Sequence, residues 1–227
     1  MTTAELIERV LDQLNRNVIF YPQAEIVTNG INPALRLLCL LKPTLLTKRA
    51  VVSLQPEEVF LDLRVLAPRS FRIQRVAIGD ISNDIPVASQ GRSGDLRRTS
   101  LAALRGQRDW FSKKKAFPET YYTHGLLWLG LHPRFTQALT VSLVFSALPQ
   151  PLAVEQPTGE PETPRQWDSV LSDIATCILE AKEGSGEVEK AMERLSKILG
   201  DEPFKQLLKI LKAERLKQQY AGMRPSA

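Results

Sequence analysis

The sequence predicts an α+β fold, in which helices form both ends of the chain and strands form the middle. Three observations lead to this class. Residues 118–152 hold three strand-like runs, because β-branched and aromatic residues are dense there and Gly and Pro mark the ends of each run. Apolar residues recur at helical spacing in residues 3–41 and again after residue 166. With 227 residues, the chain corresponds to one domain or one and a half, which is enough to bury a substantial core.

The first element should be an amphipathic helix over residues 3–15. Thr2 and Glu5 have the spacing of a capping box, in which each side chain accepts a hydrogen bond from the other residue's backbone. Apolar residues then recur on one face of the helix as far as Leu14. This pattern indicates a helix that packs against a neighbour along one side.

A second, largely apolar helix is predicted over residues 34–41. Asn32 has the side chain of an N-cap, and Pro33 suits the first helical position. The preceding pair, residues 29–30, is Asn-Gly, which is typical of a turn. Residues 26–29 are compatible with either a helical turn or extended chain.

The next part of the chain should contribute three strands and then a basic segment. We expect the strands over residues 51–54, 59–63 and 71–78. The polar stretch that follows, residues 79–94, suits a loop or a long exposed hairpin. Inside the basic segment, Ser100 to Leu104 should form one short helix with the serine as its N-cap.

Three consecutive strands are then predicted over residues 120–124, 126–131 and 139–145, and we expect them to form the floor of one small sheet. In the last strand apolar and polar side chains alternate, which indicates that one of its faces lies on a core. Trp128 is expected in that core because aromatic side chains are large core components. Trp110 and the adjacent phenylalanine should anchor the basic segment to it.

A proline-rich stretch, residues 149–164, should be an extended tether between the strands and the last helices. Helical stripes begin at Trp167 and at Val188, and the short Gly-Ser-Gly link between them indicates an antiparallel helix pair. Gly200 suits the C-cap of the second helix. A third helix is expected from Phe204, followed by an end that should be disordered on its own.

These patterns divide the chain into N-terminal helices (1–48), a β-rich domain (49–152) with a basic loop (91–115), a tether (153–165), a helix pair (166–200) and a C-terminal helix with a tail (201–227). The basic loop holds eight Lys and Arg against two Asp, whereas the formal net charge of the whole chain is +5. Such a concentration suggests an acidic partner, either nucleic acid or a negatively charged protein face. The plainer alternative is a solvated loop.

No pattern of catalytic or ligand-binding residues stands out. His124 and His132 lack acidic or Cys neighbours at the spacing of a metal site, and no phosphate-binding glycine loop is present. The carboxylate pairs lie in turns or beside Pro, where solvent explains them better than acid–base catalysis. Cys39 and Cys177 should be buried free thiols of a cytosolic protein. We expect a soluble, non-enzymatic protein with no cofactor, no metal, no signal peptide and no membrane segment.

Several patches of sequence together carry a family resemblance. They are Ala4–Leu14 with Ile31-Asn32 and Leu35–Leu41, Val52–Glu57, Trp110 with Pro118–Tyr122 and Leu129–Pro133, Leu139–Phe145 with Pro149–Leu152, and Trp167–Leu199. In this order the chain resembles the head-to-tail adaptor proteins of tailed bacteriophages, also called head-completion or connector proteins. The resemblance covers about residues 3–200, and the basic loop and the third C-terminal helix depart from it.

The resemblance implies a helical bundle of the N-terminal helices and the C-terminal helix pair, with an inserted small β-rich domain and an extended C-terminal arm. It also implies a homo-oligomeric ring, commonly dodecameric, that joins the portal to the tail or nozzle proteins and extends the DNA channel. DNA would pass through the lumen without sequence-specific binding. The protein would be made in the host cytoplasm and would lie in the virion at the head–tail junction.

Two groups of residues are then candidate interfaces. The apolar face of the last helix should contact the portal through Phe204, Leu207, Leu208 and Leu211. Cations of the basic loop should contact a neighbouring subunit or the tail through Arg97, Arg98, Arg105, Lys113, Lys114 and Lys115. The alternative is a nucleic-acid-binding packaging or regulatory protein that uses the same segment, residues 91–115.

Overall fold

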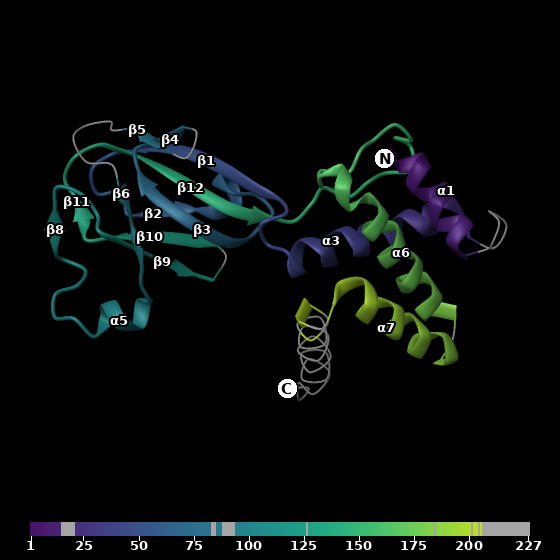
Figure 1. Ribbon diagram of the computed structural model, residues 1–227. Coiled ribbons are helices and arrows are strands. Elements are labelled where there is room, and N and C mark those ends of the chain that lie inside the picture. The colour runs from purple at the N-terminus through teal and green to yellow at the C-terminus, as the bar shows by residue number, and fades with distance from the viewer. Residues whose placement is uncertain are drawn as a thin grey trace, which may run out of the picture. The chain divides into compact units, whose positions relative to one another are not determined.

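Figure 1 shows the computed structural model of the chain, which describes residues 1–14, 21–82, 85–87, 94–125, 127–183, 185–200, 202–203 and 205. The α+β class is confirmed, because helices and sheets are both present. The chain forms two compact units. The first, called here the helical unit, combines Met1–Lys42 with Pro149–Ala227, and the second, the β unit, is Pro43–Leu148. The expected divisions at residues 48 and 152 lie a few residues further along the chain.

The helical unit contains α1 (Thr3–Leu14), α2 (Gln23–Glu25), a π-helix η1 (Ile26–Ile31), α3 (Asn32–Leu41), a 3₁₀-helix η2 (Arg165–Trp167), α6 (Asp168–Glu183) and α7 (Ser185–Leu199). The predicted capping box at the start of α1 is confirmed. The Thr2 N–H donates to Glu5 Oε2 at 2.7 Å, and the Glu5 N–H donates to Thr2 Oγ1 at 3.3 Å. Leu6 and Val10 are fully buried on the face of α1 that the sequence pattern indicated.

The segment α2, η1 and α3 is one continuous helical run, so two local predictions are wrong. Residues 29–30 form no turn but lie inside the π-helix, and Asn32 is no N-cap because the residue before it is already helical. A Cβ on Gly30 would lie 2.9 Å from Leu179 Cδ1 of α6, so glycine permits close helix packing here. The Asn32 side chain instead pairs with the backbone of Leu152, donating at 3.0 Å and accepting at 2.8 Å.

The proline-rich stretch contains turns at residues 154–155 and 157–158 and is fixed to the helical unit by hydrogen bonds, so it is not an extended free tether. The Thr3 N–H donates to the carbonyl of Gly159 at 2.7 Å, and the Ala4 N–H donates to that of Pro157 at 3.1 Å. These bonds satisfy backbone N–H groups of the first turn of α1, which no intrahelical carbonyl can reach. The stretch therefore completes the start of α1.

Helices α6 and α7 form the rest of the core of the helical unit. Leu171, Ile174 and Leu179 of α6 are fully buried, and Leu195 of α7 is buried as well. The predicted C-cap is confirmed, because Gly200 adopts a φ of 77° and its N–H donates to the carbonyl of Ser196 at 2.9 Å. The predicted third helix from Phe204 lies almost wholly outside the described residues.

The β unit holds two four-stranded sheets (Figure 1). The first has the order β1 (Thr47–Leu54), β12 (Leu139–Ala147), β3 (Ser70–Ile78) and β6 (Gly94–Asp95). The second has the order β2 (Phe60–Asp62), β10 (Trp128–His132), β9 (Thr120–His124) and β7 (Arg97–Arg98). Two short pairs, β4 (Asp80–Ser82) with β5 (Ile85–Val87) and β8 (Lys114–Lys115) with β11 (Arg134–Phe135), and two short helices, α4 (Leu63–Leu66) and α5 (Leu101–Arg105), complete the unit.

The three consecutive strands do not form one sheet, so that expectation is wrong. β9 and β10 form a hairpin in the second sheet, whereas β12 lies between β1 and β3 in the first. As a central strand, β12 is buried on both faces and not on one. The hydroxyls of its second face are satisfied: Ser142 Oγ donates to the Gly79 carbonyl at 2.6 Å, and Ser146 Oγ accepts from Gln74 Nε2 at 2.7 Å.

The core of the β unit lies between the two sheets. Leu129 and Leu131 of β10 and Val141 and Leu143 of β12 are almost fully buried. The sheets share the same two lateral edges: β1 and β2 are joined by residues 55–59 at one edge, and β6 and β7 are joined through Leu96 at the other. Each edge therefore presents strands of both sheets.

Candidate functional site

The described part of the basic loop is distributed over three elements. Arg97 and Arg98 form β7, which pairs in parallel with β9. Arg105 ends α5, and the lysines follow on the way into β8. The Ser100 side chain accepts from the Ala103 N–H at 3.1 Å, which confirms the predicted N-cap of α5. The loop thus folds onto the second sheet, and its cations do not form a single cluster.

Two of the predicted interface cations are already paired within the chain. Lys114 Nζ donates to Glu57, and Lys115 Nζ lies 2.5 Å from Glu119 Oε1. The hydrogen bond and charge of Lys114 lower the pKa of Glu57. By contrast, no carboxylate of the described residues forms an ion pair with the other four predicted cations: Arg97, Arg98, Arg105 and Lys113. These four are the cations available to a partner.

An aromatic cluster fixes the end of the basic loop to the outer face of the second sheet. The Trp110 ring lies 6.4 Å from Tyr122 and 6.2 Å from His132, and the Trp110 carbonyl lies 2.9 Å from His132 Nε2. Gly130 makes room for this cluster, since a Cβ there would lie 2.2 Å from the Tyr122 ring. Trp110 is therefore an anchor, but on the outer face of the sheet and not in the core between the sheets. Phe111 is exposed, with the Arg134 guanidinium 4.0 Å from its ring centroid.

Trp128 is also outside the core, which corrects the expectation for this residue. Its side chain is 37% exposed, and the Arg64 guanidinium lies 5.6 Å from the ring centroid. It lines a groove of about 410 Å³ that is formed by Phe60, Leu101, Arg105, Trp110, Tyr122, His124 and Trp128. Burial raises the pKa of the Tyr122 hydroxyl, and the charge of Arg105 partly opposes that shift. The groove is therefore aromatic with one cationic side.

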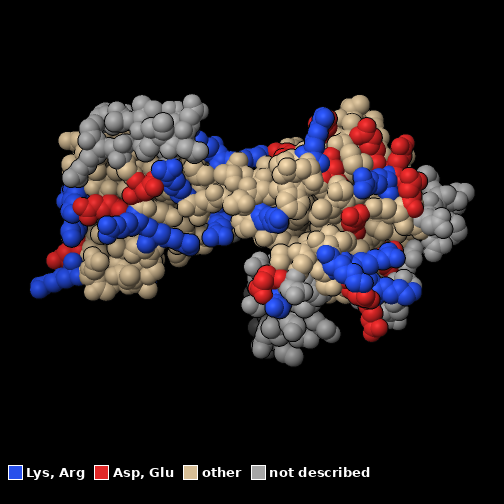
Figure 2. All heavy atoms as spheres, viewed as in Figure 1, with Lys and Arg blue, Asp and Glu red and all other residues tan. Residues whose placement is uncertain are grey.

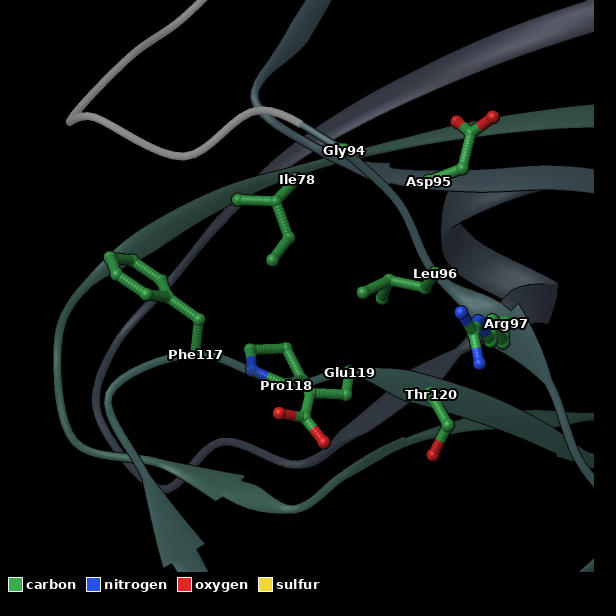
Figure 3. Close-up of a pocket in the computed structure, with 9 residues that line it drawn as sticks. All are labelled: Ile78, Gly94, Asp95, Leu96, Arg97, Phe117, Pro118, Glu119 and Thr120. Carbon is green, nitrogen blue, oxygen red and sulfur yellow. The ribbon is translucent and has the colours of Figure 1, made fainter.

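A second hollow, of about 530 Å³, lies at the edge formed by β6 and β7 (Figure 3). Ile78 points into it from the first sheet, Leu96 from the crossing between the sheets, and Phe117 and Pro118 from the segment before β9. Asp95 and Glu119 also line it, but they pair with Arg75 and Lys115. Arg97 is then the charged side chain of this hollow that has no ion-pair partner among the described residues.

The His, Cys and carboxylate side chains that could bind a metal or act in catalysis can be followed in the described residues. Among them, no group of three or more His, Cys, Asp or Glu could hold a metal ion. Glu57 has a lowered pKa, which is the opposite of what a general acid needs at neutral pH. Cys39 and Cys177 are buried free thiols, as predicted, and burial raises the pKa of each to about 11. In the part of the chain that the structure describes, no helix has the length and apolar character needed to cross a membrane.

The two units differ in the charge that they present. Figure 2 shows more Lys and Arg than Asp and Glu over the visible face of the β unit, with acidic patches among them, whereas the helical unit shows both signs close together. The cations are evident in the sequence, but the exposed aromatic groove was not predicted from it. A signal was present, since Trp128 and Gly130 alternate with Leu129 and Leu131 along β10 and so share the face opposite to the buried leucines. The predicted portal-contacting residues, Phe204, Leu207, Leu208 and Leu211, lie outside the described residues.

Comparison with known proteins gives the family. Residues 1–192 match the family model of the SU10 adaptor protein, which covers most of the chain. No curated protein matches the chain. The chain therefore belongs to the SU10 adaptor protein family and is a phage head-to-tail adaptor.

Proposed function

We propose that the protein forms a homo-oligomeric ring that joins the portal to the tail or nozzle proteins and extends the DNA channel at the head–tail junction. The observation that supports it most is the apolar surface of the β unit. Six large apolar residues of its described part are exposed: Val51, Phe60, Val65, Phe111, Leu127 and Trp128. Phe60 and Trp128 share the aromatic groove, and an exposed apolar groove of this kind marks an interaction site. A repeated head-to-tail contact between copies can close into a ring. Twelve copies is the number that the family resemblance favours.

The proposed interfaces use different parts of the chain. Arg97, Arg98 and Arg105 contact a neighbouring subunit or the tail, together with Lys113. Lys114 and Lys115 contribute less, because each already has a carboxylate partner. The portal is contacted by the apolar residues of the last predicted helix: Phe204, Leu207, Leu208 and Leu211.

The test is assembly with the portal protein of the same phage. We expect the purified chain to form a ring on portal particles, visible by electron microscopy and by mass photometry as a discrete increase in mass. The Leu207→Asp, Leu208→Asp double variant should lose this binding, while Leu40→Asp, a matched change at an exposed site of the helical unit, should retain it. A wild-type chain that neither binds the portal nor forms oligomers would contradict the proposal.

A second candidate function is binding of nucleic acid through the basic segment. The observation that favours it is the set of cations without carboxylate partners in the described part of the loop, Arg97, Arg98, Arg105 and Lys113. Such a contact with phosphates would weaken steeply as salt rises. Fluorescence anisotropy with a short DNA duplex at 50 and 200 mM salt distinguishes the two functions. A chain that binds DNA with a strong salt dependence and ignores the portal would favour this alternative.

A further inference from the structure

Two exposed apolar residues lie at the lateral edge where β1 and β2 meet. Phe60 belongs to β2, Val65 belongs to α4, which follows β2, and both line one hollow at this edge. Val65 protrudes most, with a relative exposure of 76%. We call these two residues the apolar edge.

Carboxylates lie next to the apolar edge, where the two sheets meet. A hollow of about 570 Å³ between β1, β2 and α4 has Glu57, Glu58 and Asp62 as its only charged lining residues. Glu57 is paired with Lys114, and Asp62 with Arg64. Glu58 accepts a hydrogen bond from the Gln55 N–H at 2.7 Å but forms no ion pair within the described residues. It is the carboxylate of this edge that is available to a cation from outside.

The opposite lateral edge has the complementary properties. Its hollow beside β6 and β7 is lined by the apolar side chains of Ile78, Leu96, Phe117 and Pro118 (Figure 3). Asp95 and Glu119 also line it, but each has a cationic partner within the chain, Arg75 and Lys115 respectively. Arg97 stands at this hollow with no ion-pair partner among the described residues. One edge therefore offers protruding apolar side chains beside a free carboxylate, and the other offers an apolar hollow beside a free guanidinium.

We infer that the apolar edge of one copy of this chain docks against the β6–β7 hollow of the next copy, with Val65 entering the hollow and Glu58 facing Arg97. The two surfaces differ and lie on opposite edges of one unit, so the contact is head-to-tail and leaves both surfaces free for further copies. Opposite charges at the two edges favour this order of docking over edge-to-like-edge contact. This inference rests on the proposed ring and names the surfaces that build it.

The test uses charge reversal within the full chain assembled on portal particles. Glu58→Arg and Arg97→Glu should each lower the assembly constant about tenfold or more, because each places like charges together. The variant with both changes should recover most of the wild-type assembly. Glu8→Arg, on exposed α1 surface, is the matched control and should assemble as the wild type does. Single variants that assemble normally, or a double variant that fails to recover although its circular dichroism and unfolding midpoint are those of the wild type, would overturn the inference.

Cross-linking supplies a second readout that does not depend on charge. Val65→Cys combined with Phe117→Cys should form disulfide-linked chains in the assembled ring under mild oxidation, while either single variant should not. The native thiols do not interfere, because Cys39 and Cys177 are buried. A ring that assembles on the portal but gives no cross-link overturns the docking and leaves the proposed function intact. A wild-type chain that forms no ring overturns both.

Discussion

The two units of this protein use their apolar residues in opposite ways. The helical unit keeps them inside: of its described large apolar side chains, only Leu40 is exposed, at 36%. The β unit exposes six of its described large apolar side chains, and two of them, Phe60 and Val65, lie at one edge. The arginines do not separate the units in this way. Arg165 and Arg194 of the helical unit have carboxylate partners, but so do Arg64 and Arg75 of the β unit.

This contrast separates the two tasks of an assembly protein. A unit whose apolar groups are buried internally is stable by itself, and a unit that leaves apolar groups exposed gains stability when a partner covers them. We therefore expect substitutions inside the helical unit to lower the free energy of unfolding. Substitutions on the edges of the β unit should instead weaken assembly.

The largest expected effect concerns the two thiols of the helical unit. Burial raises the pKa of Cys39 and Cys177 from 9.0 to about 11, so the thiolate fraction at pH 8 falls about a hundredfold. A thiol-specific reagent should therefore react about a hundredfold more slowly with the folded chain than with the chain in urea. Since the folded state favours the neutral thiol, this contribution to stability is complete below pH 9 and is lost as the pH rises from 9 to 11. Equal reaction rates in the two states would show that the two thiols are not buried in the folded helical unit.

Gly130→Ala should be the most damaging small change in the β unit. The added Cβ would lie 2.2 Å from the Tyr122 ring, which must then move away from Phe60 and Trp110. Overpacking of this kind lowers the free energy of unfolding by about 3 kcal/mol. Urea unfolding followed by tryptophan fluorescence measures the loss. Gly94→Ala is the control, because a Cβ there meets no atom within 4 Å, and its midpoint should not change.

Asn32→Ala should weaken the helical unit by a smaller amount. It removes both hydrogen bonds to the backbone of Leu152 and leaves that N–H and carbonyl in partly buried positions. An unsatisfied buried group costs about 1–2 kcal/mol, which a urea-unfolding curve resolves. An unfolding midpoint equal to that of the wild type would show that the proline-rich stretch does not depend on this contact. The helical unit would then be less tightly packed than its few exposed apolar side chains indicate.

The smallest expected effect is that of Lys115→Ala. The Lys115–Glu119 ion pair is exposed at both ends, and such pairs contribute about 0–1 kcal/mol. Neither the unfolding midpoint nor assembly on the portal should change beyond error. A clear assembly defect would mean that this lysine contacts a partner in spite of its internal carboxylate, and the set of available cations would then have to include it.

Local features of the fold could be predicted from the sequence, and long-range ones could not. The capping box of α1, the N-cap of α5 and the C-cap at Gly200 depend on neighbouring residues, and all three predictions are confirmed. Asn32 was assigned to a cap because its partner, Leu152, lies far along the chain. β12 was placed beside β10 because neighbours in sequence often pair in space, whereas its partners are β1 and β3.

The candidate site divides in the same way. Its cations are visible in the sequence as a run of charge, but their partners are not: Lys114 finds Glu57, which lies much earlier in the chain. The aromatic groove combines residues of β2, α5, β9 and β10, and only the fold brings these together. The cations of the site could therefore be predicted from composition, whereas the grouping of its apolar residues required the structure.

The two ends of the β unit are joined side by side: the Ala147 N–H donates to the Leu46 carbonyl at 3.0 Å, next to the first residues of β1. A segment whose two ends lie next to each other can be inserted into a loop of another unit without disturbing the fold of that unit. Recombination between viral genomes can then replace this segment by another of different surface and leave the host helices unchanged. Such exchange would let one adaptor scaffold acquire new neighbours faster than point mutation allows.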